Sequence, residues 1–361
     1  MDTRIEEIAR LVAASTPLVV KTLDPADRVA VRQWDAFVDA CPEATFFHKS
    51  GWQQVLKEVF AHRTHFLYAE RSGAIEGVLP LAQVKSVLFG NTLVSLPFAV
   101  YGGVAANSAA AVEALEGEAQ AIATRLGVDH LELRNLRHRH PDWPLQDLYV
   151  RFRKPLEPEV DDNLLAIPRK QRAMVRKGIK NGLRSEIDQD LGRFFALYAD
   201  NVHRHGTPAL PRRYFETLQR VFAADCEALT VVDDSGRPLS VVLSFYFRDE
   251  VLPYYAGDDV SARQLAANDF KYWELMRRSC ERGLKIFDYG RSKQGTGSYS
   301  FKKNWGFEPQ PLFYEHCLYR RDSIPQNNPS NAKYQMLIKT WRRMPIGLAN
   351  WLGPFIVRNL G

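Results

Sequence analysis

The same order of expected secondary structure occurs twice along this chain. In each half, helical periodicity precedes hairpin-forming strands, a longer helix and a further strand. In the first half the elements are expected at 18–23, 25–40, 50–60, 64–70, 75–85, 109–125, 131–133 and 149–152, after a helical segment at 2–14. In the second half they are expected at 192–205, 212–222, 228–232, 239–247, 251–256, 261–283, 285–289, 300–304 and 312–319. The hairpins exclude the strict strand–helix alternation of a Rossmann domain, so the order predicts two α/β units with mixed sheets.

Length and composition agree with two such units. A chain of 361 residues with 45% hydrophobic and 25% charged residues is typical of about two globular domains. We place the first domain at 1–160, the second at 161–321, and a linker with a C-terminal amphipathic helix at 322–361. The four cysteines lie far apart without a C-x-x-C pair, which argues against a zinc knuckle or a disulfide framework and fits the cytoplasm.

We expect no secretory signal at the N-terminus, because the first residues are acidic and amphipathic. No run approaches the roughly 18 apolar residues of a membrane-spanning helix. The last stretch, 346–361, is apolar and contains Trp351 and Phe355 among Arg and Asn. Two alternatives follow: the segment lies on a membrane surface, or it packs on the protein's own body.

The densest basic segment is IPRKQRAMVRKGIKNGLR at 167–184, where Pro168 starts a helix. Arg169, Arg172, Arg176 and Lys180 recur at helical spacing and form one cationic stripe. Guanidinium groups in such a stripe can hold the phosphates of a nucleotide-sugar or of a nucleic acid. The alternative is a solvated basic face whose buried side is supplied by Met174, Val175 and Ile179.

A second segment, DYGRSKQGTGSYSFKKNWGFEPQ at 288–310, combines a strand end, a glycine-containing loop and a short helix that Ser298 can cap. Backbone amides at such a helix start can bind an anion, although an ordinary flexible loop has the same composition. The ammonium of Lys302, next to Phe301, is placed to stabilise an oxyanion. The nearby carboxylates Asp288 and Glu308 are expected to be structural.

Other recognised chemistries are not indicated. The nine histidines have no H-E-x-x-H or Cys/His spacing, and the side chains of His203 and His205 diverge on a helix, so we expect no metal site. The chain lacks a G-x-S-x-G elbow, a Walker loop and a G-x-G-x-x-G after a strand. Serine-hydrolase, NTPase and dinucleotide-binding interpretations are therefore disfavoured, and we expect no tightly bound cofactor.

From about residue 45 to 319 the chain resembles the FemABX family of aminoacyl transferases, most closely the FemAB-like proteins associated with exosortase/PEP-CTERM exopolysaccharide systems. The resemblance rests on FFHKSGWQQVL, RKQRAMVRKGIKNGL and FDYGRSKQGTGSYSFKKNWGFEP. It implies two tandem GNAT-like acyl-CoA N-acyltransferase folds. It also implies transfer of an acyl or aminoacyl group to an amine of a nucleotide-linked or lipid-linked sugar or peptide, such as a peptidoglycan precursor.

The resemblance assigns roles to individual residues. Phe301 and Lys302 match the family's Phe-Lys pair, in which the lysine stabilises the tetrahedral oxyanion, and Trp305 takes the place of the second aromatic residue. Residues implied to bind substrate or phosphate are Arg172, Arg176, Lys57 (with Lys49 as an alternative), Arg291, Lys293 and Trp305.

The donor is left open between aminoacyl-tRNA and acyl-CoA. The coiled-coil arm of tRNA-using FemABX members is missing, whereas the segment expected to bind CoA pyrophosphate reads ARQLAAND at 262–269 and has no glycine. The alternatives are an acyl-CoA-dependent N-acetyltransferase acting on an amino sugar and a non-catalytic module that binds an anionic polymer. We expect a cytoplasmic protein that does not bind DNA, with tRNA as a partner under the first donor and membrane contact through the C-terminal helix.

Overall fold

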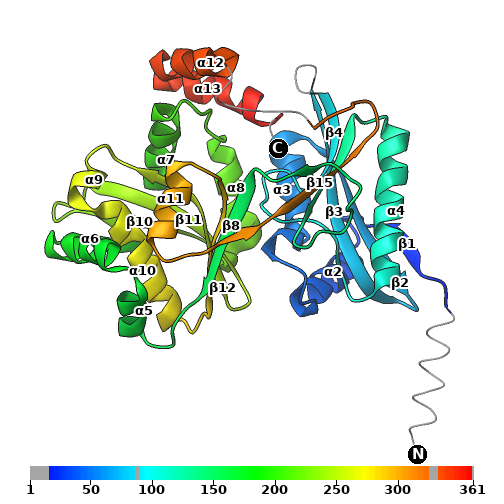
Figure 1. Ribbon diagram of the computed structural model, residues 1–361, viewed down its shortest axis with the longest axis horizontal. Coiled ribbons are helices and arrows are strands. Elements are labelled where there is room, and N and C mark those ends of the chain that lie inside the picture. Colours follow the sequence, from blue (N-terminus) through cyan, green and yellow to red (C-terminus); the bar gives the residue numbers. More distant parts are fainter. Residues whose placement is uncertain (1–15, 87–89, 325–331, 360–361) are drawn as a thin grey trace, which may run out of the picture. The chain divides into compact units, whose positions relative to one another are not determined.

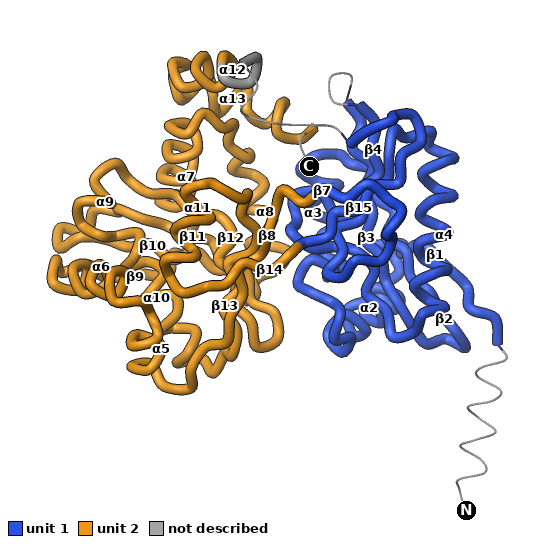
Figure 2. The backbone as a smooth tube through the Cα atoms, in the orientation of Figure 1, with its two compact units in different colours: residues 1–146, 312–324, 361 blue, residues 147–311, 325–360 orange. Residues whose placement is uncertain are grey.

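Residues 16–86, 90–324 and 332–359 are described by a computed structural model (Figure 1). The helix expected at 2–14 and most of the linker at 322–331 lie outside these residues. By compactness the chain divides into two units (Figure 2). Unit 1 comprises residues 1–146 and 312–324 with residue 361, and unit 2 comprises residues 147–311 and 325–360.

Unit 1 is a sheet with the strand order β1-β2-β3-β4-β6-β15-β7, and β5 pairs with β3. Helix α4 covers one face, where its small residues pack on leucines such as Leu79 and Leu131, and α2 and α3 supply Trp34 and Trp52 to the other face. Its elements are β1 Val19–Thr22, α2 Arg28–Ala40, η1 Phe46–His48, α3 Gly51–Phe60, β2 Arg63–Arg71, β3 Ala74–Ser86, β4 Gly90–Ser95, β5 Ala105–Ala106, α4 Ala109–Leu126, β6 His130–Asn135, β7 Leu145–Gln146 and β15 Phe313–Leu318.

Unit 2 is a sheet with the strand order β14-β8-β13-β12-β11-β10-β9. Helix α10 packs on one face together with α6, where Gly178 lets α6 approach Phe270 closely, and α7 packs on β12 through Gly257. Its elements are β8 Tyr149–Pro155, α5 Val160–Ala166, α6 Arg169–Lys180, β9 Arg184–Ile187, α7 Gly192–Arg204, α8 Arg212–Phe222, η2 Ala223–Asp225, β10 Cys226–Val232, β11 Pro238–Phe247, β12 Glu250–Asp258, α9 Ala262–Leu265, α10 Ala267–Glu281, β13 Ile286–Lys293, α11 Gly297–Asn304, β14 Pro309–Pro311, α12 Ala332–Arg343 and α13 Ile346–Val357.

The two units share one topology, which confirms the expected fold class of mixed α/β units. In unit 1 the antiparallel strands β2, β3 and β4 are followed by α4 and by β6, which is parallel to β4. In unit 2 the antiparallel strands β10, β11 and β12 are followed by α10 and by β13, which is parallel to β12. An antiparallel strand completes each sheet, β15 beside β6 and β8 beside β13.

These completing strands make the compact units differ from the expected domain boundaries. Strand β8, expected to close the first half, pairs in unit 2, whereas β15, expected in the second domain, pairs in unit 1. The chain therefore passes from unit 1 to unit 2 at 146/147, back at 311/312 and to unit 2 again at 324/325, whereas the expected boundaries are 160/161 and 321/322. Hydrogen bonding between distant strands, rather than position along the chain, decides where each strand belongs.

Three helix ends also differ from expectation. The helix expected at 25–40 begins at Arg28, because the Asp27 carboxylate accepts from the amides of Val29 and Ala30 and caps it there. The helix expected at 261–283 is interrupted at Ala266, which adopts a left-handed conformation between α9 and α10. Thr296, rather than Ser298, caps α11 by accepting from the Tyr299 amide.

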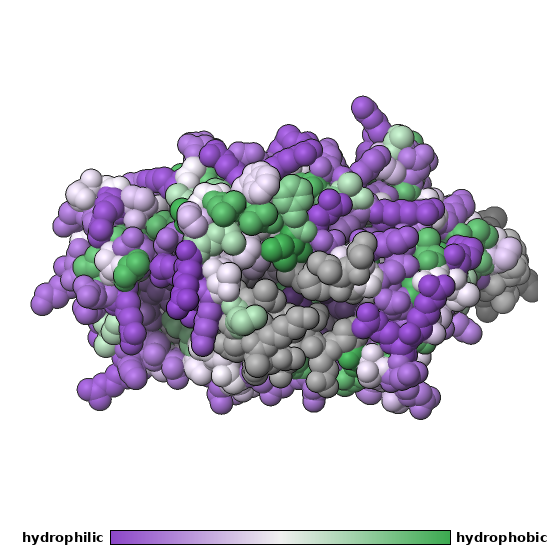
Figure 3. All heavy atoms as spheres, turned by 90° about the horizontal axis from the view of Figure 1, so that it is seen from above, coloured by the Kyte–Doolittle hydropathy of each residue, from purple (hydrophilic) through white to green (hydrophobic). Residues whose placement is uncertain are grey.

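The C-terminal residues form two helices, α12 and α13, which are separated at Pro345, as the helical periodicity of 332–344 and the following proline predict. Their buried side consists of Trp341, Ala349 and Gly353, with Gly353 packed against the backbone of Ala209 after α7. Figure 3 shows hydrophobic side chains on the face of the molecule seen from above. Among the described residues of α12 and α13, the exposed large hydrophobic side chains are Met336, Ile346, Leu348, Trp351 and Phe355. The segment thus packs on the protein's own body and still exposes apolar side chains. Among the described helices, no span is both long and apolar enough to cross a bilayer.

Candidate functional site

The parallel strands β12 and β13 of unit 2 separate soon after they begin. They pair only at Glu250 with Ile286 and at Val251 with Phe287, although β12 continues to Asp258 and β13 to Lys293. Past the paired positions, the two strands no longer hydrogen-bond to each other as a ladder. Such a separation of neighbouring strands is a place where a ligand can bind within the sheet.

Strand β13 also contains a bulge directly after the separation. Its register against β8 shifts between Asp288 and Arg291, and Gly290 occupies the bulge with a φ of 61°. The Gly290 amide donates to the Asp288 carboxylate at 2.7 Å, which fixes the turn of the backbone. Gly290 was expected in a loop; it lies instead inside the strand, because a bulge needs a residue that tolerates the left-handed region.

Lys302 reaches this bulge from α11. Its Nζ donates to the carbonyl oxygens of Tyr289 at 2.7 Å and Arg291 at 3.0 Å, the two residues that flank Gly290. The ring centroids of Phe152 and Tyr289 each lie 5.6 Å from Nζ. The lysine therefore stabilises the bulge, and two of the three hydrogen atoms of its ammonium are engaged there.

Burial lowers the pKa of Lys302 from its ordinary 10.5 to about 7, because a cation loses its hydration inside the unit. The negative charge of Asp288 opposes this effect, and the positive charge of Arg291 adds to it. The side chain is consequently both an ammonium and a neutral amine near neutral pH. A lysine poised in this way can stabilise negative charge or exchange a proton.

The neighbours of Lys302 on α11 and just after it have different surroundings. Phe301 is half-buried and contacts the rings of Tyr272 and Trp305, with centroids 5.5 and 5.8 Å away. Trp305 has no exposed surface, and its Nε1 donates to the Asp269 carboxylate at 3.1 Å. Because a substrate cannot touch a fully buried ring, we assign Trp305 to the core of unit 2 rather than to substrate contact.

The basic stripe is present on α6. Val175 and Gly178 form its buried side, while Ile179, expected to be buried, is 50% exposed. Arg172 is half-buried and Arg176 is exposed. No carboxylate in the described part of the chain forms an ion pair with either guanidinium, so both can bind an anion.

The remaining candidate residues are divided between the units. Arg291 lies on β13 with its guanidinium 4.6 Å from the centre of the Tyr149 ring, and Lys293 ends the same strand. Lys57 is exposed on α3 of unit 1, and Lys49 forms an ion pair with Asp39 at 2.6 Å. Unit 2 therefore contains Arg172, Arg176, Arg291, Lys293, Phe301 and Lys302, and unit 1 contains Lys57.

The α9–α10 junction lies in the segment expected to bind CoA pyrophosphate. Ala266 adopts the left-handed backbone with a φ of 61°, which a glycine would adopt without strain. Ala266 and Ala267 are buried, and the Ala266 amide donates to the carbonyl oxygens of Ala262 and Arg263. This amide is therefore not offered to a phosphate, and the junction gives no support for CoA binding.

Sequence reasoning missed the carbonyl groups of Tyr289 and Arg291 as partners of Lys302. Gly290 was the available signal, since it directly follows the strand expected at 285–289 and a glycine next to strand residues can mark a bulge. The burial of Lys302 had no comparable signal, because its position on α11 follows from the packing of the helix on β13.

Comparisons with known proteins found a family model that matches part of unit 2. Residues 169–303 match the family described as Acetyltransferase (GNAT) domain. Over 103 residues the chain is 25% identical to the UDP-N-acetylmuramoylpentapeptide-lysine N(6)-alanyltransferase of Weissella viridescens. The aligned segment covers 28% of this chain and 31% of that relative, so the chain spans about a third of the relative's length.

Solved structures share the fold over most of the chain. The crystal structure of FemX superposes with a TM-score of 0.67 at 15% identity, covering 84% of this chain and 98% of FemX. A tandem GNAT protein from the clavulanic acid biosynthesis pathway gives 0.54 at 13% identity, covering 85% of this chain and 100% of that protein. The chain thus has two tandem units of GNAT-like fold, and residues 169–303 match an acetyltransferase domain of that fold.

Proposed function

We propose that the protein is an acyltransferase that moves an acyl or aminoacyl group to an amine of a cell-envelope precursor. The observation that carries the proposal is the buried Lys302, fixed at the β13 bulge where β12 and β13 separate, inside the segment that matches an acetyltransferase domain. The alanyltransferase similarity supports a sugar-linked peptide acceptor, and an exopolysaccharide precursor is the second acceptor class.

In the proposed mechanism the neutral acceptor amine attacks the donor carbonyl, and the carbonyl oxygen acquires negative charge. When this tetrahedral intermediate collapses, the bond to the tRNA hydroxyl oxygen or to the CoA sulfur breaks, and the leaving group takes up the proton that the amine loses. The Lys302 ammonium stabilises this oxyanion with the hydrogen that the Tyr289 and Arg291 carbonyls leave available. One such donor contributes about 3 to 4 kcal/mol to the transition state. Arg172 and Arg176 hold the phosphate of the donor or acceptor, and Arg291 and Lys293 add positive charge near the bulge.

The donor can be aminoacyl-tRNA or acyl-CoA, and acetyl-CoA binding is tested first. Calorimetric titration of acetyl-CoA into the full chain, at salt high enough to suppress nonspecific binding to α6, separates the two donors. Saturable binding identifies the CoA-dependent N-acetyltransferase. If acetyl-CoA does not bind while charged tRNA supports transfer to UDP-N-acetylmuramoyl pentapeptide, the Fem-like donor is established.

Substitution of Lys302 tests the catalytic role. Lys302→Met should lower turnover by about 100-fold or more while leaving the KM of the donor nearly unchanged, because an oxyanion donor acts only in the transition state. Lys303→Met is the matched control, since Lys303 is exposed on the same helix. The non-catalytic alternative makes the opposite prediction: cellular function would survive Lys302→Met and be lost on replacing Arg172 and Arg176.

We further propose that α12 and α13 contact the cytoplasmic face of a membrane. Trp351 and Phe355 are 65% and 59% exposed on α13, and the chain after Asp322 contains five Lys or Arg and no Asp or Glu. This combination of exposed apolar side chains and positive charge favours an anionic lipid surface. Sedimentation with vesicles containing phosphatidylglycerol, but not with pure phosphatidylcholine vesicles, is expected, and Trp351→Ser with Phe355→Ser should abolish it.

A further inference from the structure

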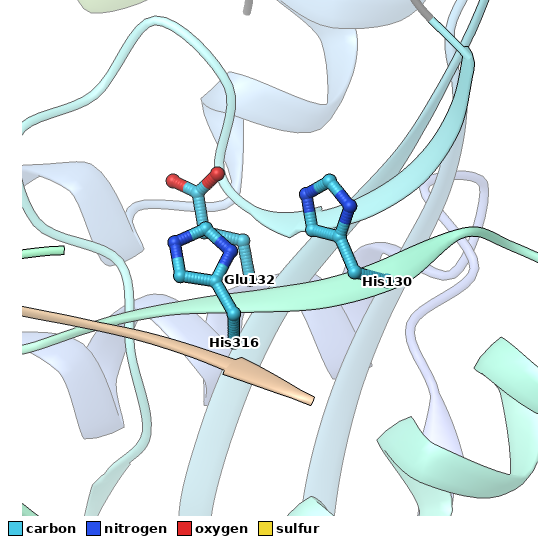
Figure 4. Close-up of side chains that lie close together, drawn as sticks. All are labelled: His130, Glu132 and His316. Atoms are coloured by element: carbon cyan, nitrogen blue, oxygen red, sulfur yellow. The ribbon is translucent and has the colours of Figure 1, made fainter. Parts of the chain in front are cut away.

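Three potential metal ligands lie together on the sheet of unit 1, in a part of the protein that the proposed transferase chemistry does not use. They are His130 and Glu132 on β6 and His316 on β15 (Figure 4). One ligand atom from each of the three side chains lies within 4.8 Å of the other two. His316 is directly opposite Glu132 in the antiparallel register, and His130 shares a strand face with Glu132 because it is two residues away.

The histidines lack the hydrogen bonds that buried imidazoles normally make. His316 is 2% exposed and His130 is 4% exposed. Neither ring nitrogen of His316 has a hydrogen-bond partner among the described residues, and Nδ1 of His130 has none there either. Buried polar atoms are nearly always satisfied, so unpartnered nitrogens gathered at one point indicate a ligand that accepts their lone pairs.

The carboxylate between the histidines is held in place by its own partner. Arg134 Nε donates to Glu132 Oε1 at 2.7 Å, and Arg134 is itself fixed by donating to the carbonyl oxygens of Leu96 and Ala99. Such an outer partner orients a ligating carboxylate. Because the guanidinium also places positive charge near the site, it weakens the binding of a cation, and we expect micromolar rather than nanomolar affinity.

We propose that His130, Glu132 and His316 bind a divalent transition-metal ion, of which Zn²⁺ fits the two imidazoles and one carboxylate best. Zinc sites with two histidines and one glutamate keep a further position for water. The Glu132 side chain is 14% exposed, so solvent can reach the ligands. In a tetrahedral site the ligand atoms are about 3.3 Å apart, so a bound ion draws the side chains together by rotation about their side-chain bonds.

The ion would join two segments that are far apart in sequence. Strand β6 belongs to the first part of the chain, and β15 is reached only after the chain has passed through unit 2. A metal ion between them therefore stabilises the pairing of β15 with the sheet of unit 1. Binding to the native state alone raises the unfolding temperature.

Zinc titration of the metal-free full-length protein, in competition with a chromophoric chelator, tests the proposal. We expect one Zn²⁺ per chain, an increase in the unfolding temperature, and visible absorption typical of low coordination number when Co²⁺ replaces Zn²⁺. His316→Gln and Glu132→Gln should each weaken binding by more than about 100-fold, beyond the usual effect of losing an outer partner. His205→Gln, which changes an exposed histidine of unit 2, should bind like the wild type.

The wild-type measurement keeps the test independent of whether the variants fold. Absence of stoichiometric Zn²⁺ and Co²⁺ binding to the wild type overturns the proposal and leaves a buried water molecule as the partner of the imidazoles. Equal affinity in the wild type, His316→Gln and Glu132→Gln overturns it as well, because the ion would then bind elsewhere. If the variants do not fold, the Co²⁺ spectrum of the wild type decides: absorption typical of low coordination number supports the proposal, and its absence overturns it.

Discussion

Replacing Lys302 by methionine should change how the stability of the protein depends on pH. Methionine retains most of the length of the side chain but has no amine to titrate. In the native wild type, burial lowers the pKa of Lys302 to about 7, whereas in the unfolded chain it returns to its ordinary 10.5. Between these two values the unfolded chain binds one more proton than the native chain, so the free energy of unfolding increases with pH.

The size of this increase follows from the two pKa values. A difference of one bound proton is worth about 1.4 kcal/mol per pH unit. The native lysine is itself half protonated at pH 7, so the expected gain from pH 7 to pH 9 is about 2 kcal/mol. At 7% exposure the Lys302 side chain is too buried for solvent to screen much of this effect. The penalty is greatest below pH 7, where the buried lysine is charged, and it disappears toward pH 10.5.

Urea denaturation at pH 7, 8 and 9 measures the effect in wild type, Lys302→Met and the control Lys303→Met. The wild type and Lys303→Met should both gain about 2 kcal/mol relative to Lys302→Met over this range. Lys302→Met also removes the donor to the carbonyls of Tyr289 and Arg291, and this contribution lowers the stability by an amount that does not vary with pH. Only the pH-dependent difference concerns the lysine's ionisation.

Parallel curves for wild type and Lys302→Met would refute the reasoning. They would mean that Lys302 has the same pKa in the native and unfolded states, and therefore that the lysine is hydrated rather than enclosed at the β13 bulge. If the stability of the wild type instead decreased with pH relative to Lys302→Met, the native protein would stabilise the charged lysine, as a neighbouring carboxylate does. The linear dependence on urea should have the same slope in all three proteins, since they bury the same surface.

Two further substitutions test the packing and hydrogen bonding of unit 2. Gly257→Ala should lower the free energy of unfolding by about 1 to 3 kcal/mol, measured by thermal or urea unfolding, because the added Cβ would lie 2.6 Å from the Tyr198 Cα. The control is Gly117→Ala on α4, whose added Cβ has no atom within 4 Å and which should be neutral or stabilising. Equal effects of the two would contradict the close approach of α7 to β12. Asp188→Ala should lower the free energy of unfolding by about 1 to 3 kcal/mol, because the buried Thr230 hydroxyl, which donates to the Asp188 carboxylate at 2.6 Å, loses its acceptor. A decrease below about 0.5 kcal/mol would show that this hydrogen bond is not maintained in solution.

Features that depend on residues close together in the chain could be predicted from the amino-acid sequence. Periodicity predicted most helices and hairpin strands, and the repeated order of elements predicted two similar units, because a helix or hairpin forms among residues close in sequence. The stripe on α6 was predicted in the same way, since residues three and four apart share a helix face. The candidate Lys302 and Phe301 came from a local motif and lie in unit 2 as a neighbouring pair on α11.

The pairing of strands from distant parts of the chain, and the side-chain contacts that this pairing creates, could be read only from the folded structure. Strands β8 and β15 have ordinary strand sequences, and nothing local distinguishes a partner nearby in sequence from one more than a hundred residues away. The pairing of β15 with β6 brings His316 beside Glu132, which no motif spacing could indicate. The enclosure of Lys302 likewise depends on how α11 packs on the bulge of β13, because burial is a property of the whole folded unit rather than of any segment.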